Sequence, residues 1–217
     1  METQTGRLTY EDYLRLPEMN QRYEIIEGEL KMTPSPTVRH QRLVSRIWNL
    51  LNQVVSEKGL GEVLLAPMDV VIEKGPALRT RQPDILFISH ERIAAAGCDQ
   101  DNFDLLSRLE MAPELMVEVL SPGESRPTMK DKLKDYHKIG VSECWLVSSE
   151  AETVEVVDVS GPQTTTLAVL GIDGSVTSSV LDNLTLEVRQ IFGQQRFVPT
   201  NRASCSAKVC QISGVIG

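Results

Sequence analysis

The chain has 217 residues and a formal net charge of −8, with 24% charged and 41% hydrophobic residues. These values are ordinary for a globular domain and argue against collagen, a coiled coil or a wholly disordered chain. No apolar run approaches the roughly 18 residues of a membrane span, and the N-terminus lacks a signal-peptide apolar block, so we expect a cytoplasmic protein. The four cysteines have no C-x-x-C spacing, which favours reduced thiols over a disulfide framework or a zinc ribbon.

The N-terminal part is expected to hold two helices separated by a hairpin. Residues 8–18 predict a short helix, and the segment YEIIEGELKMTPSP, residues 23–36, predicts a hairpin that turns near Gly28. Residues 38–58 give the clearest helix, because apolar residues recur there at three- and four-residue steps. Gly59 follows as a stop signal.

Three predicted strands, one helix and a fourth strand follow. The strands cover residues 62–74, 83–89 and 114–121, and the last two are nearly continuous apolar runs, typical of strands buried on both faces. A helix over residues 130–140 and a strand over residues 143–150 come next. Because a strand–helix–strand crossover is parallel and right-handed, we expect a mixed α/β fold with a central sheet flanked by helices.

The C-terminal part is expected to add a second hairpin and a tail. Residues 153–159 and 164–170 predict the hairpin, and residues 181–193 complete the domain. The domain is taken as residues 1–197. Residues 198–217 are small, polar and weakly periodic, which predicts a disordered tail.

Two carboxylates stand out because apolar strands surround them. Asp84 opens one predicted strand behind Pro83, and Glu118 lies inside the run LMVEVLS. A lone carboxylate in such a strand is costly unless it is paired or binds a metal. Two neighbouring carboxylates raise each other's pKa unless a cation joins them, and Mg²⁺ or Mn²⁺ prefers oxygen ligands of this kind. The pattern therefore predicts that Asp84 and Glu118 hold Mg²⁺ or Mn²⁺.

A lysine on the next predicted helix can complete this site. Lys132 follows Glu118 by 14 residues, in the first turns of a helix that begins beyond the Glu118 strand. From there it can reach back to the carboxylates, orient a water molecule or stabilise charge on a phosphate. Lys130 and Lys134 remain alternatives for the same role. An Asp, a Glu and a Lys around Mg²⁺ are the groups needed to hydrolyse a phosphodiester.

Several motifs in this order resemble one known family. They are YEIIEGEL, a helix begun by His40, QPDILFI, ELMVEVLSP and DKLKDYHKIGVSECWLV. Over residues 8–193 the chain is similar to the Uma-type restriction endonucleases, a family of the PD-(D/E)XK nuclease superfamily. The resemblance implies a restriction-endonuclease-like core of a helix, three strands, a helix and a strand. It also implies a Mg²⁺-dependent DNA endonuclease.

The resemblance also carries site residues over to this chain. Asp84 matches the aspartate of the PD half, and Glu118 matches the acidic residue of the (D/E)-x-K half. The lysine position of that half holds Leu120, so the resemblance implies that Lys132 supplies the lysine from the following helix. Three further matches, which the resemblance places in assisting roles, are Glu24, Glu29 and His40.

Each candidate also has a simpler structural interpretation. Asp84 can merely begin a strand, Glu118 can be an edge-strand acid facing solvent, and the hairpin glutamates can be surface acids. His40 can simply cap its helix. The family usually has an aspartate where this chain has Thr128, and another where it has Ser148. These departures favour an alternative function, namely a catalytically weak or inactive nuclease-fold module that binds DNA or protein.

The distribution of charged residues along the chain bears on whether the protein binds nucleic acid. The net charge of −8 argues against nucleic acid, but residues 37–60 carry +3 and residues 121–140 carry +2, in the two helices expected to flank the acids. Arg79 and Arg81 precede Asp84 and add to these basic surroundings. The sequence therefore predicts DNA as the substrate, and cutting of both strands predicts a homodimer. A metallohydrolase acting on another substrate, or a structural oligomer, is a further alternative.

Overall fold

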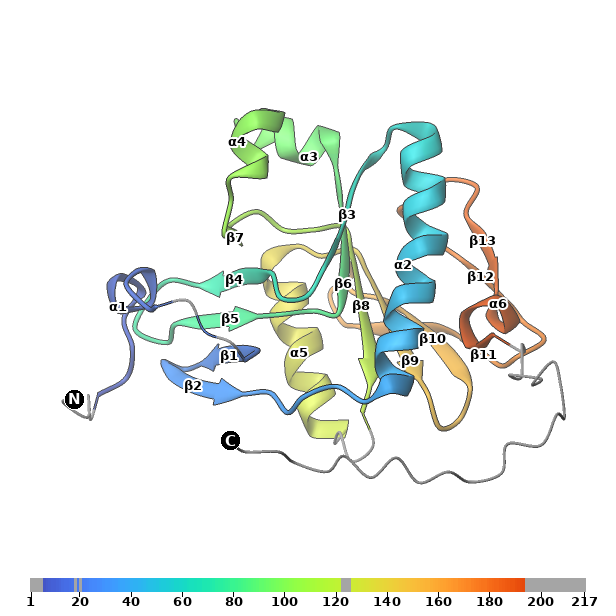
Figure 1. The fold of residues 1–217 in the computed structure, drawn as a ribbon, viewed down its shortest axis with the longest axis horizontal. Coiled ribbons are helices and arrows are strands. Elements are labelled where there is room, and N and C mark those ends of the chain that lie inside the picture. The colour runs from blue at the N-terminus through green and yellow to red at the C-terminus, as the bar shows by residue number, and fades with distance from the viewer. Residues whose placement is uncertain (1–5, 18, 20, 122–125, 194–217) are drawn as a thin grey trace, which may run out of the picture.

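The computed structural model describes residues 6–17, 19, 21–121 and 126–193 (Figure 1). The tail expected at residues 198–217 and the domain boundary at residue 197 lie outside this part of the chain. The helices and strands, in chain order, are α1 (Tyr10–Leu14), β1 (Tyr23–Ile26), β2 (Glu29–Met32), α2 (Val38–Lys58), β3 (Gly61–Leu65), β4 (Asp69–Glu73), β5 (Arg79–Arg81), β6 (Ile85–Ser89), α3 (His90–Ala95), α4 (Gln100–Asp104), β7 (Arg108–Leu109), β8 (Leu115–Leu120), α5 (Arg126–Ile139), β9 (Glu143–Ser148), β10 (Thr153–Asp158), β11 (Thr165–Leu170), β12 (Ser175–Thr177), β13 (Thr185–Glu187) and α6 (Val188–Phe192).

A six-stranded mixed sheet forms the centre of the molecule, with strand order β11-β10-β9-β8-β6-β3. Strands β8 and β9 pair in parallel, which confirms the parallel connection expected through the helix between them. The other pairings of this sheet are antiparallel, including the predicted C-terminal hairpin of β10 and β11. The strands β6, β8 and β9 are buried along nearly their whole length, as their continuous apolar runs require.

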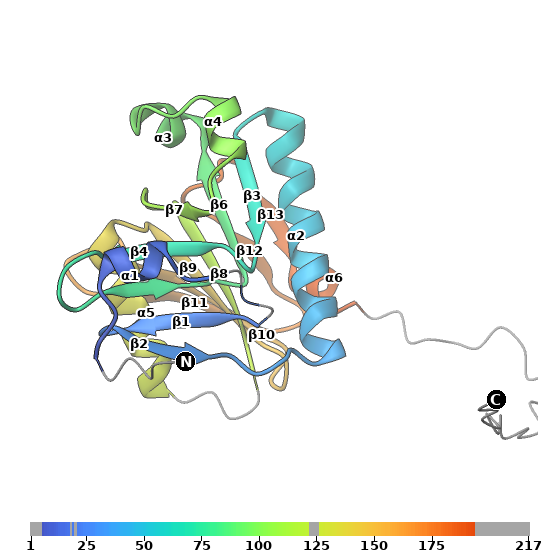
Figure 2. The same cartoon turned by 60° about the vertical axis from the view of Figure 1, so that its left-hand side comes forward.

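Helices α2 and α5 cover opposite faces of this sheet (Figures 1 and 2). Leu43 of α2 belongs to the same buried cluster as Val117 of β8, whereas Leu133 of α5 belongs to the cluster of Met116. Because successive side chains of a strand point to opposite faces, Glu118 shares the α5 face with Met116.

The two long helices place the histidine and lysine candidates. Helix α2 has the predicted bounds; the Thr37 side chain accepts a hydrogen bond from the His40 N–H, and Gly59 ends the helix with a φ of 61°. His40 therefore lies in the first turn of α2. Helix α5 begins at Arg126, earlier than expected, which puts Lys132 in its second turn.

A second sheet of five strands, with order β2-β1-β5-β4-β7, lies beside the first (Figure 2). It contains the predicted N-terminal hairpin of β1 and β2. The prediction of one strand over residues 62–74 is wrong, because β3 ends at Leu65 in one sheet and β4 begins at Asp69 in the other. The cis peptide bond Ala66–Pro67 lies between them. Both halves of this segment are apolar, so its hydrophobicity did not reveal the break.

The remaining elements complete the two sides of the central sheet. Strands β12 and β13 form a small separate sheet, and with α6 they pack into the same buried cluster as α2. Helices α3 and α4 and the short strand β7 lie in the segment between β6 and β8. In the part of the chain that the structure describes, no helix has the length and apolarity needed to cross a membrane.

Candidate active site

Asp84 and Glu118 lie at the same end of two neighbouring antiparallel strands. The ladder between β6 and β8 pairs Ile85 with Val117, so Asp84 comes just before the paired part of β6 and Glu118 comes just after the paired part of β8. The Val119 N–H donates a hydrogen bond to Asp84 Oδ2 at 2.9 Å, which ties the carboxylate of Asp84 to the strand of Glu118. Both acids are only 4% exposed. The structure therefore brings the two predicted acids together in a buried setting.

Two basic side chains hold the carboxylate of Asp84. Arg22 Nη1 donates to Asp84 Oδ1 at 2.7 Å, and His40 Nε2 lies 3.2 Å from Asp84 Oδ2. Burial raises the pKa of Asp84, but His40 and Arg22 outweigh it and hold that pKa below its ordinary value. The same contact with Asp84 raises the pKa of His40. The arrangement thus favours an ionised Asp84 beside a protonated His40.

Glu118 is bound by Lys132 and Tyr136, both from α5. Lys132 Nζ donates to Glu118 Oε2 at 2.9 Å, and the Tyr136 hydroxyl donates to Glu118 Oε1. Burial raises the pKa of Glu118 to about 6; Lys132 opposes this shift, and the charges of Asp84 and Glu24 add to it. The Glu118 carboxyl can therefore exchange a proton near neutral pH.

The structure shows which of the three lysines, Lys130, Lys132 or Lys134, contacts the buried acids. Lys132 is almost fully buried and contacts Glu118, whereas Lys130 and Lys134 are exposed on the outer side of α5. Successive lysines spaced by two point to different sides of a helix, so only one of the three can reach the sheet.

Glu24 links the lysine to a buried arginine. Glu24 Oε1 lies 3.7 Å from Lys132 Nζ, and Glu24 Oε2 accepts a hydrogen bond from Arg81 Nη1 at 2.9 Å. Arg81 also donates to Asp131 Oδ2 and to Asp135 Oδ2, each at 2.6 Å. This network joins β1, β5 and α5 and fixes Glu24 beside Lys132.

The expectation that Arg79 and Arg81 enrich a basic surface is wrong. The Arg81 side chain is 3% exposed, and Arg79 pairs with Asp131 at 2.6 Å and with Asp135 at 3.3 Å. Acids from α5 therefore neutralise both arginines. The sequence could not show this, because the partners lie about fifty residues apart in the chain.

Glu29 is the candidate that the structure places apart from the others. It lies on β2 at the edge of the five-stranded sheet, its side chain is 57% exposed, and it pairs with Lys31. No contact between Glu29 and the other five candidates occurs among the described residues. Its exposed position matches the simpler interpretation of a surface acid.

Two further side chains of the site were not predicted from the sequence. Arg22 precedes β1 outside any motif, and nothing in the sequence indicates that it reaches Asp84. Tyr136 does have a signal, since it follows Lys132 by four residues and therefore shares its helix face. The sequence therefore contained enough information to predict that Lys132 and Tyr136 lie on the same face of α5 and that both can approach Glu118.

The donor set can be compared with the needs of Mg²⁺. This ion is usually held by one or two carboxylates, keeping several water molecules and contacts with substrate phosphates. Asp84 and Glu118 supply two carboxylates at one end of the sheet. Among the described residues, no group of three or more His, Cys, Asp or Glu side chains is placed to hold a metal. The described residues therefore offer such an ion at most these two carboxylates and do not form a cage made wholly of protein ligands.

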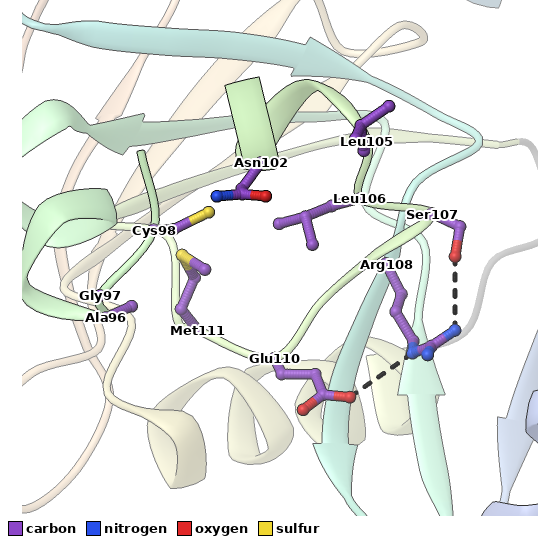
Figure 3. Close-up of a pocket in the computed structure, with 10 residues that line it drawn as sticks. All are labelled: Ala96, Gly97, Cys98, Asn102, Leu105, Leu106, Ser107, Arg108, Glu110 and Met111. Carbon is purple, nitrogen blue, oxygen red and sulfur yellow. Dashed lines mark hydrogen bonds and ion pairs between the residues drawn. The ribbon is translucent and has the colours of Figure 1, made fainter. Parts of the chain in front are cut away.

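Pockets open on different sides of the fold. One of about 470 Å³ lies beside α2 and includes Asp84 and His40 in its lining. Another of about 580 Å³ lies near α3, α4 and β7 and contains none of the candidates (Figure 3). Figure 3 shows that Arg108 in that pocket is paired with Glu110, so its charge is already compensated. Of these two pockets, the one beside α2 is the one that reaches a buried acid of the site, Asp84.

The fold is that of a mixed α/β protein with two buried acids at one end of its central sheet. The crystal structure described as a putative nuclease belonging to DUF820, from Anabaena variabilis ATCC 29413, matches with a TM-score of 0.70. It is 23% identical, and the match covers 85% of this chain and 97% of that chain, a likeness that shows the fold. The chain belongs to the Uma2 family, described as "Putative restriction endonuclease", whose model matches residues 10–189. A search of curated proteins finds no match.

Proposed function

We propose that this protein is a Mg²⁺-dependent DNA endonuclease with a PD-(D/E)XK-type site, able to use Mn²⁺ in place of Mg²⁺. One observation carries the proposal: Lys132 Nζ lies 2.9 Å from Glu118 Oε2, on the strand next to Asp84. An acid pair and a lysine at adjoining strand and helix positions are the groups that phosphodiester hydrolysis requires. The family description supports a nucleic acid as the substrate.

Asp84 and Glu118 would hold the metal ion. When bound, Mg²⁺ supplies charge stabilisation for the phosphate and the leaving oxygen. His40 and Arg22 hold the Asp84 carboxylate in one orientation through both of its oxygens. Lys132 and Tyr136 together do the same for Glu118. These contacts fix the two acids before a substrate arrives, which lowers the cost of assembling the site.

Lys132 positions the attacking water and the phosphate. An ammonium group has three donors and no acceptor, so the charged lysine orients these groups and does not take up a proton. Glu24 lies beside Lys132 and assists by holding the ammonium in place. His40 completes the set of assisting residues that we propose, and Glu29, which is exposed on β2 and pairs with Lys31, is left out of it. Since cleavage of both DNA strands needs two sites, we also propose that the active form is a homodimer.

The test is a cleavage assay on supercoiled plasmid. We expect the purified full chain to produce nicked and then linear DNA with Mg²⁺ or Mn²⁺, and to produce neither in EDTA. Cleavage that persists in EDTA, or intact plasmid at every metal concentration, would contradict the proposal.

One observation favours a second candidate function, a nuclease-fold module that binds DNA or protein without cutting. All four oxygens of the two acids already accept contacts from protein donors: Asp84 from Arg22 and His40, Glu118 from Lys132 and Tyr136. Calorimetry separates the two functions. Heat of Mn²⁺ binding at millimolar metal supports the nuclease, whereas salt-dependent DNA binding without any metal binding supports the module.

A further inference from the structure

The pocket beside α2 has one wall made by a single helix face. Gln41, Val44, Ser45 and Trp48 follow one another at steps of three, one and three residues, so they form one stripe on α2. Leu65, the last residue of β3, lines the pocket as well and is 40% exposed. The wall therefore combines apolar and polar side chains that face a common space.

The apolar part of this lining is suited to stacking. Trp48 is half-buried, and its indole N–H donates to the Val63 carbonyl oxygen at 2.9 Å, which fixes the ring in place. Together with the exposed side chain of Leu65, it offers a rigid apolar surface. Nucleic-acid bases stack on aromatic side chains regardless of their sequence, because every base has a flat π-face.

The polar part of the lining can pair with base edges. The Gln41 side chain makes no hydrogen bond with any described residue. Asn49 Nδ2 donates to the Ser45 carbonyl oxygen at 2.8 Å, which leaves the Asn49 amide oxygen as an acceptor. Side-chain amides offer both donors and acceptors, as the edges of bases do.

One end of the pocket is the proposed catalytic site. Asp84, His40 and Arg22 all line it, so a molecule bound there lies directly against Asp84. Its volume of about 470 Å³ falls within the range of roughly 300–1,000 Å³ that small-molecule sites have. A base with its sugar fits such a space, whereas a base that remains stacked in a duplex cannot enter it.

We infer that this pocket binds one nucleotide of the cleaved DNA strand, turned out of its stack, next to the phosphate that is cut. The inference rests on the proposed function and adds a substrate class to it: DNA with unpaired nucleotides, such as single strands, flaps and distorted duplexes. The base lies against Trp48 and Leu65, and the amides of Gln41 and Asn49 contact its edge.

Binding in the absence of metal tests this assignment apart from catalysis. Trp145 is fully buried and Trp48 is not, so quenching of tryptophan emission by DNA reports on the pocket. The full chain in EDTA is titrated with a short single-stranded oligodeoxynucleotide and with the same sequence as a blunt duplex. We expect quenching and tighter binding for the single strand.

A matched pair of substitutions on α2 locates the binding. Ser45→Phe fills the pocket, whereas Ser56→Phe adds the same ring on an exposed part of the same helix. We expect Ser45→Phe to weaken single-strand binding on the order of tenfold, about the value of one stacked base, and Ser56→Phe to leave it unchanged. Gln41→Ala, at an exposed position, should weaken binding a few-fold without affecting the fold.

The outcomes separate this inference from the proposed function. Equal affinity for single strand and duplex, or equal affinity of Ser45→Phe and Ser56→Phe, overturns the nucleotide site even if the plasmid is cleaved. If DNA quenches the tryptophan emission of the unsubstituted protein and Ser45→Phe abolishes this quenching, the nucleotide site is supported, even if no metal-dependent cleavage is found. In that case only the proposed endonuclease activity would be contradicted.

Discussion

The ammonium of Lys132 lies 2.9 Å from the carboxylate of Glu118 in the computed structure, and both groups are buried. The lysine comes from the second turn of α5 and the glutamate from the strand before it. A charged pair is stable in this setting only if further contacts satisfy it. Tyr136 and Glu24 provide those contacts, so the pair is part of a network that joins both sheets to α5.

Replacing Lys132 by methionine should remove activity while preserving the fold. Without the ammonium, Glu118 loses the cation that opposes its raised pKa, and the water loses its orienting group. We expect a fall in plasmid-nicking rate on the order of a hundredfold or more. Lys130→Met is the matched control, since Lys130 is exposed on the same helix. Equal rates for the two variants would exclude Lys132 from the mechanism.

The two hairpin glutamates should behave differently. Glu24→Gln weakens the contacts with Lys132 and Arg81, so we expect a several-fold lower nicking rate. Glu29→Gln removes only an exposed pair with Lys31, and solvent screens such pairs so that they add little to stability. We therefore expect no change in rate or melting temperature. A larger loss for Glu29→Gln than for Glu24→Gln would show that the wrong glutamate has been placed in the site.

Arg81 should be a major contributor to stability. Its guanidinium is buried and donates to Glu24, Asp131 and Asp135, and Arg81→Met removes the one cation that contacts all three acids among the described residues. Removing one partner of a buried ionic network costs about 3–5 kcal/mol. Urea unfolding measures this loss, with Arg39→Met as the control, because Arg39 is exposed and pairs with Glu152 only at 3.7 Å. A loss for Arg81→Met no greater than that for the control would contradict the network.

The pH dependence of stability should carry a signature of Glu118. Burial raises the pKa of this group in the folded state to about 6, above its ordinary value of 4.5, so the folded protein keeps a proton that the unfolded chain releases. The stability of the metal-free protein should therefore fall as pH rises from about 4.5 to about 6, by on the order of 1–2 kcal/mol. Urea unfolding in EDTA across this window measures the change, and Glu118→Gln should remove it. Identical pH profiles for the two proteins would contradict the raised pKa.

Most of the core could be predicted from the sequence because its signals are local. The apolar stripe of α2 gave that helix its bounds, and the runs around Asp84 and Glu118 identified two buried neighbouring strands. The split of residues 62–74 between two sheets was missed, because hydrophobicity does not show where a strand changes partners.

The site was predictable only in part, for a related reason. Asp84, Glu118 and Lys132 stand out against their local sequence, and the structure brings them together. The contact of Arg22 with Asp84 and the burial of Arg81 depend on tertiary packing between distant segments. A count of charges along the chain assigned Arg81 to a basic surface, since it could not include the acids that α5 places against it.

The most direct test of the proposed site compares two buried glutamates. Glu118→Gln and Glu143→Gln each neutralise an acid that is nearly inaccessible to solvent, but Glu143 lies at the opposite end of the β8–β9 ladder, bound by Trp145 and Ser179. The measurement is the initial rate of Mg²⁺-dependent plasmid nicking by each variant, at a temperature where both are folded. We expect Glu118→Gln to lose nicking and Glu143→Gln to retain it. Retention of nicking by Glu118→Gln would contradict the assignment of the active site.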